Sequence, residues 1–172
     1  MWTGLAAVAG DEGAARRLTS VAGRVPLDDT HPVFVAFAAM VAARRGDGEL
    51  GRWCAPHLRA LGDRTIVAGL GTTVLGFGRH FLGLALWAQG AHRAAAGEFE
   101  QAATLARDVG ADLWEAYSLV DLWEVSQQGR LTVDDDVRAR LERARELDAP
   151  RLVRLIDDAL TDVRADVSAT GS

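Results

Sequence analysis

Hydrophobic residues recur along most of the chain at the three- and four-residue spacing of amphipathic helices, and strand-like alternation is almost absent. Glycine interrupts this pattern at four places, where an apolar segment ends and a more polar one begins: Gly10, Gly46, Gly90 and Gly129. Because the residue after a helix end often needs positive φ, these glycines predict tight turns between paired helices. Their separations of 36, 44 and 39 residues indicate a repeat of helical hairpins.

The pattern predicts helices at residues 2–9, 11–22, 32–45, 48–61, 74–89, 91–108, 112–128, 133–147 and 149–165. We therefore expect an all-α fold, an α-α superhelix of about four hairpins with a C-terminal capping helix. A single domain would cover residues 1–168, and residues 169–172 would form a disordered tail. Asp134, Asp135 and Asp136 stand at the start of the eighth helix, where acids cap the helix and interact well with its dipole.

Composition narrows the classes of function. The formal net charge of −5 argues against a nucleic-acid surface, which needs a basic field. All nineteen basic residues are arginine, which excludes a Schiff-base lysine and a phosphate-loop lysine. The apolar run from Phe81 to Ala88 is too short to span a bilayer, and the first residues lack the basic region of a secretory signal. We expect a cytoplasmic protein with no nucleic-acid or membrane partner.

Two segments resemble sites of chemistry at first inspection. The glycine-rich stretch Gly69–Gly78 lacks the lysine of a phosphate loop, and only Thr65–Val67 beside it is strand-like. We interpret it as a flexible connector between the second and third hairpins, with a functional loop as the alternative. Cys54 and His57 could touch on one helix, but no third group orients them, so a core cysteine and a surface histidine are the simpler interpretation.

The remaining polar residues predict no catalytic, metal or cofactor site. The four histidines have neither the i, i+4 spacing nor the acid–histidine motif of a helical metal site: His31, His57, His80 and His92. Most carboxylates alternate with arginines at helical spacing, as on a solvated helix face. Glu115 and Asp121 fit that interpretation less well, but spacing alone does not make them a paired-acid site.

The third hairpin matches the tetratricopeptide signature at Leu82-Gly83, Gly90, Ala95, Phe99 and Ala102. A longer segment, Leu58–Glu124, resembles the C-terminal helical-repeat region of large actinobacterial ATP-binding transcriptional regulators of the LuxR-type and adenylate-cyclase-associated groups. The resemblance implies a regulatory module that senses ligands or partners, with ATPase and DNA-binding modules on a larger parent chain. Those two modules are not present in this sequence.

In tetratricopeptide stacks the first helix of each hairpin lines the concave face. Transferring that face to this chain predicts a partner or ligand groove formed by Met40, Phe77, His80, Leu84, Trp87, Leu119 and Trp123. If these residues are exposed, they form a contiguous apolar patch of the kind that binds partners. The alternative is that a short stack closes on itself, or packs on a neighbouring domain, and buries them as core.

The sequence therefore predicts a non-catalytic protein-interaction or ligand-sensing module of a cytoplasmic transcriptional regulator, which binds a protein or a small hydrophobic ligand. Two alternatives stay open. One is a stand-alone small-molecule enzyme that uses its acids and His80, and the other is a purely structural dimerisation module.

Overall fold

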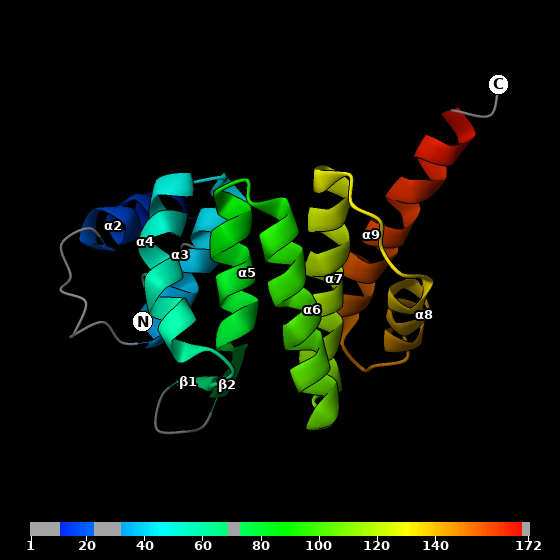
Figure 1. Cartoon of the computed structure of the whole chain (residues 1–172), viewed down its shortest axis with the longest axis horizontal. Helices are drawn as coiled ribbons and strands as arrows, with labels where there is room; N and C mark the ends of the chain where they lie inside the picture. Colours follow the sequence, from blue (N-terminus) through cyan, green and yellow to red (C-terminus); the bar gives the residue numbers. More distant parts are fainter. Residues whose placement is uncertain (1–10, 23–31, 69–72, 170–172) are drawn as a thin grey trace. The chain divides into compact units, whose positions relative to one another are not determined.

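The computed structural model describes residues 11–22, 32–68 and 73–169, with side chains for residues 11–20, 32–68 and 73–161. This part of the chain is mostly helical (Figure 1). Its elements are α2 (Glu12–Ala22), α3 (Pro32–Arg45), α4 (Gly48–Leu61), β1 (Thr65–Ala68), β2 (Thr73–Phe77), α5 (Gly78–Ala88), α6 (His92–Asp108), α7 (Asp112–Gly129), α8 (Asp135–Ala144) and α9 (Pro150–Ala169). The predicted helix 2–9, the joint at Gly10 and residues 170–172 of the predicted tail lie outside the described residues.

The predicted helical class is confirmed, and α3 and α4 have the bounds that the sequence predicted. The prediction of a helix over residues 74–89 is wrong at its start, because α5 begins only at Gly78. The residues before it form a strand, so the segment Gly69–Gly78 is not simply a connector. Within the described residues, Thr65–Ala68 and Thr73–Phe77 make a two-stranded antiparallel sheet.

The β-hairpin is held against the start of α5. Thr65 pairs with Phe77, and the register is irregular between Ile66 and Val67. The Gly78 N–H donates to the carbonyl of Arg64 at 2.9 Å. A Cβ at Gly78 would lie 2.7 Å from the Gly62 carbonyl oxygen, so only glycine fits there without a shift of backbone. This close approach explains why the residue at the junction of β2 and α5 is glycine.

The chain divides into two compact units, residues 1–98 and 99–172, which are described separately. In the first unit α3, α4 and α5 pack against one another (Figure 1). α3 is its central helix, with eight of its fourteen residues buried. The α4–α5 crossing is close, since a Cβ at Gly51 would lie 2.6 Å from the Ala85 carbonyl oxygen. Small residues thus let the two backbones approach.

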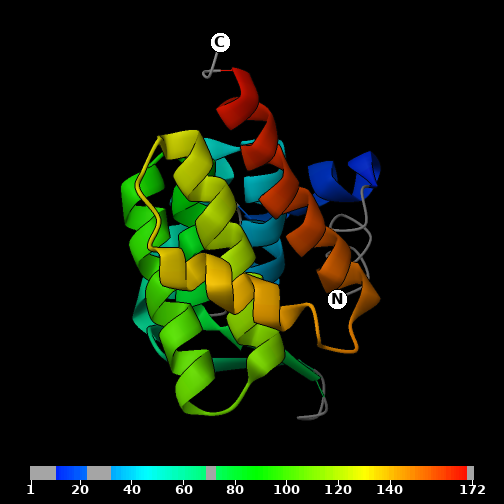
Figure 2. The same cartoon turned by 90° about the vertical axis from the view of Figure 1, so that its right-hand side faces the viewer.

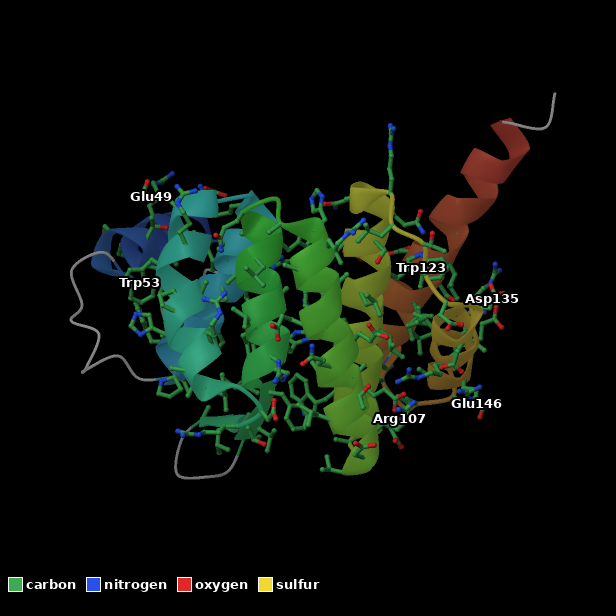
Figure 3. The ribbon with its side chains drawn as sticks, viewed as in Figure 1. Glu49, Trp53, Arg107, Trp123, Asp135 and Glu146 are labelled. Atoms are coloured by element: carbon green, nitrogen blue, oxygen red, sulfur yellow. The ribbon has the colours of Figure 1, made fainter. Side chains whose placement is uncertain are left out.

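In the second unit α7 contacts both α8 and α9. Figure 2 shows α8 lying across α7 instead of running beside it. Trp123 of α7 is buried, and its indole Nε1–H donates to the carbonyl of Ala159 on α9 at 2.9 Å (Figure 3). Asp134 caps α8 by accepting from the Asp136 N–H at 2.9 Å, as the sequence predicted. The helix after Pro150 is therefore attached to α7 by a directed hydrogen bond as well as by apolar packing.

One joint geometry recurs at the ends of four helices. The residue after the helix has positive φ: 62° at Gly46, 74° at Gly90, 69° at Gly110 and 51° at Arg130. In each joint this residue donates to the carbonyl three positions back, and its successor donates to the carbonyl five positions back, over 2.8–3.3 Å. These two bonds are the Schellman motif, which satisfies carbonyls that a helix end leaves unpaired.

The sequence located these joints only in part. The turns at Gly46 and Gly90 are confirmed. At the fourth joint the left-handed residue is Arg130 and not Gly129, which is the last residue of α7. The joint at Gly110 did not fit the expected period of about forty residues and was missed.

Arg130 offers a direct test of the joint. A left-handed conformation costs a non-glycine residue about 1–2 kcal/mol. Replacement by glycine removes this cost, but about half of the gain is offset because glycine loses more backbone entropy when the chain folds. We expect Arg130→Gly to raise the free energy of unfolding by about 0.5–1 kcal/mol, measured by urea denaturation. The matched control is Gly90→Ala, where a Cβ meets nothing within 4 Å and only φ is strained. That variant should lose about 1 kcal/mol. Equal stability of all three proteins would contradict the assignment.

Candidate binding surface

The predicted groove residues differ in their exposure. Five are buried, namely Phe77, His80, Leu84, Leu119 and Trp123. Met40 and Trp87 are half-buried. Leu119 and Trp123 belong to the second unit and the others to the first. The groove stays a prediction, and these exposures favour its alternative, in which the side chains are core.

His80, the titratable group in that set, is buried. Its ring meets the Phe81 ring edge-on, with centroids 5.2 Å apart. Burial lowers the pKa of His80 from 6.5 to about 4, since the charged imidazolium loses its hydration. At neutral pH the ring is therefore uncharged, so it adds polarity to the core but no positive charge.

Cys54 and His57 lie on α4 but differ in environment. Burial raises the pKa of the Cys54 thiol, which keeps it protonated and unreactive. His57 is half-buried, with its ring centroid 4.9 Å from that of Trp53. Its Nε2 is buried and has no hydrogen-bond partner among the described residues, and burial lowers its pKa. The predicted core cysteine is confirmed, and the histidine packs against an aromatic ring.

The two acids that the sequence singled out have separate environments on α7. Glu115 forms an ion pair with Arg140 of α8, whose Nε lies 2.8 Å and Nη2 2.6 Å from Glu115 Oε1. Burial raises the pKa of Asp121 to about 8, and the negative charge of Glu124 adds to the effect. Within the described part of the chain, no group of three or more His, Cys, Asp or Glu side chains is arranged to hold a metal ion.

Exposed apolar side chains gather at the joint between α6 and α7. Val109 is 66 % exposed and Leu113 is 40 % exposed. Trp114 and Tyr117, in the first turns of α7, are half-buried, with ring centroids 5.8 Å apart. Leu113 and Tyr117 are four residues apart on α7 and so share one face of the helix. We call these four residues the corner patch.

The other joints show that the joint geometry does not require this patch. Val109 is the residue directly before the left-handed residue of its joint. In the joints at Gly46, Gly90 and Arg130 this position is occupied by Arg45, Gln89 and Gly129, respectively. Leu113 lies three residues after the left-handed residue. In the joints at Gly46 and Gly90, which also lead directly into a helix, this position is occupied by Glu49 and Arg93, and both are exposed. Figure 3 shows Glu49 near one end of α4. The same backbone therefore accepts polar residues, and the apolar ones belong to this joint alone among the three that lead directly into a helix.

No protein-family model, curated protein or solved structure matches the chain. Among the described residues, none of the helices combines the length and apolar character needed to cross a membrane. The corner patch therefore rests on geometry and exposure alone.

Sequence reasoning missed the corner patch because it carried the concave face of another repeat onto this chain. The signal was present in the text DVGADLW, in which valine precedes the joint glycine and leucine follows three residues after it. An alignment of the chain's own joints, centred on Gly46, Gly90 and Gly110, would have shown that valine and leucine stand where the other two joints have polar residues. That alignment needed Gly110 to be recognised as a joint.

Burial of His80 predicts a pH dependence of stability. Its pKa is lower in the folded chain than in the unfolded chain, so the unfolded state binds more protons between pH 6.5 and 4. The associated stability is present above pH 6.5 and is lost as the pH falls towards 4. We expect the wild type to lose about 2–3 kcal/mol more than His80→Phe between pH 7 and pH 4.5, measured by urea denaturation. Parallel losses in the two proteins would show that His80 is accessible to water.

Proposed function

We propose that this chain is a non-catalytic interaction module made of stacked helical hairpins, and that it binds an amphipathic helix of a partner protein at the corner patch. The observation that carries the proposal is the pair Val109 and Leu113, which are exposed where the joints at Gly46 and Gly90 place polar side chains. Exposed large apolar residues grouped on one surface are typical of protein interaction sites.

The recurring joints support the stacked arrangement. At Gly46, Gly90 and Gly110 one helix ends in the same Schellman motif and the next helix starts after two or three residues. Repeats of this kind stack through their apolar faces and leave their turns open for variation. A tetratricopeptide-like superhelix is the arrangement that we propose for the whole chain.

The shape of the corner patch suits a helical partner. Leu113 and Tyr117 lie one helical turn apart on α7, and Val109 is exposed at the joint that precedes this helix. A partner helix with apolar residues at i, i+3, i+4 and i+7 can lay them against such a ridge. Trp114 and Tyr117 add aromatic groups of the kind that dominate binding energies when a partner covers them.

The setting of this interaction is proposed from the resemblance of Leu58–Glu124 to actinobacterial regulators. There, a helical-repeat module would sense the state of a partner and transmit it to ATPase and DNA-binding modules of a cytoplasmic transcriptional regulator. The buried side chains of the second unit would provide the rigid support that such a sensor needs.

The test uses three amphipathic helical peptides of about 18 residues, or five turns. Each has leucine on one face, and the other face carries lysine, glutamine or glutamate. Binding to the full chain is measured by fluorescence anisotropy. We expect at least one peptide to bind, and the double variant Val109→Arg/Leu113→Glu to weaken that binding at least about tenfold, since it removes the burial of two apolar side chains.

The double variant places at these positions the residue types of the first joint, Arg45 and Glu49, so it should fold normally, which circular dichroism checks. Val74→Thr, on the exposed face of the β-hairpin, is the matched control and should bind as the wild type does. The proposal is wrong if none of the peptides binds, or if the double variant binds as tightly as the wild type. It is also wrong if sedimentation shows a dimer that the double variant abolishes, because the patch would then bind a second copy.

A further inference from the structure

We infer that the partner helix of the corner patch is cationic, with arginine or lysine flanking its apolar face. This inference rests on the proposed function and specifies the class of partner. It is carried by the charges around the patch and by the distribution of charge along the chain, each of which is independent of the exposed apolar residues.

Charge is divided unevenly between the two units. Residues 99–172 contain sixteen acidic residues and nine arginines, a net charge of −7. Residues 1–98 contain eight acidic residues and ten arginines, a net charge of +2. The unit that contains the corner patch therefore holds the acidic excess of the chain. A field of one sign attracts a partner of the other sign and speeds its association.

Several arginines of the second unit are already neutralised within it. Arg138 pairs with Glu142 at 3.2 Å, and Arg140 lies against Glu115. Arg145 pairs with Asp157. These ion pairs join residues within α8 or link α8 to α7 and α9. The excess of acid is thus left to carboxylates outside these pairs.

Two such carboxylates border the corner patch. Asp108 precedes Val109, and Asp112 precedes Leu113. Both are exposed, and neither has an ion-pair partner among the residues that the structure describes. Arg107, visible on α6 in Figure 3, is also exposed, so the acids outnumber the base at this border by one. Exposed charges that surround an apolar centre are the usual arrangement of a binding surface.

The position of Asp108 is unfavourable for α6 itself. It lies in the last turn, where a negative charge opposes the helix dipole and costs about 0.3–1 kcal/mol. The equivalent residues of the other joints are Arg44, Ala88 and Gln128, none of which is acidic. The joint that departs from its equivalents in exposed apolar residues thus departs from them in charge as well. A cation on a bound helix would relieve this repulsion.

The same three peptides test the inference. We expect the lysine peptide to bind most tightly, the glutamine peptide less tightly and the glutamate peptide least. The double variant Asp108→Asn/Asp112→Asn should weaken the lysine peptide about three- to tenfold and leave the glutamine peptide unchanged. Raising the salt from about 0.05 M to about 0.5 M should remove most of the difference between peptides, because exposed charges are then screened.

A matched control removes two exposed acids from other helices of the same unit. Asp135→Asn/Asp158→Asn changes the net charge by the same amount as Asp108→Asn/Asp112→Asn. Its effect on the affinity for the lysine peptide should be less than half of the effect of that variant. The inference is overturned if the glutamate peptide binds as tightly as the lysine peptide, or if the two double variants have the same effect. In both cases the proposed function would still hold if a peptide binds and Val109→Arg/Leu113→Glu weakens that binding. Failure of all three peptides to bind would instead overturn the proposed function.

Discussion

The left-handed residue that ends a helix is the constraint on which this structure depends. At Gly46, Gly90 and Gly110 it lies in a link of two or three residues between helices. At these joints and at Arg130, two hydrogen bonds satisfy carbonyls that the helix end would otherwise expose. Only backbone atoms make the joint, so the side chains around it are free to differ. That freedom lets one joint acquire a surface that the others lack.

The corner patch and its acidic border are the result of that freedom. Val109 and Leu113 make no contribution that the joint requires, since arginine, glutamine and glutamate occupy the same positions elsewhere. Asp108 opposes the dipole of its own helix. A surface that is apolar at its centre and acidic at its edge is consistent with recognition of a cationic helix.

Most of the helices could be predicted from the sequence, because α2, α4, α6, α8 and α9 have amphipathic periodicity and glycine marks two of the turns. The β-hairpin could not, since its second strand, TVLGF, contains a glycine and follows a glycine-rich segment. The fourth joint was placed one residue early, because Arg130 adopts a conformation that sequence patterns assign to glycine. The groove residues were chosen by analogy with other repeats, and burial, which separates Leu119 from Leu113, is a property of packing that periodicity does not give.

The most direct test asks whether the corner patch is open in the free protein. A soluble nitroxide broadens the methyl signals of side chains that it can approach, and methyl-labelled protein allows each side chain to be followed by NMR. The account predicts strong broadening at Val109 and Leu113 and almost none at the buried Leu119 and Val125. If the methyl groups of Val109 and Leu113 are as protected as that of Leu119, the patch is already covered within the chain, and the binding surface proposed here does not exist.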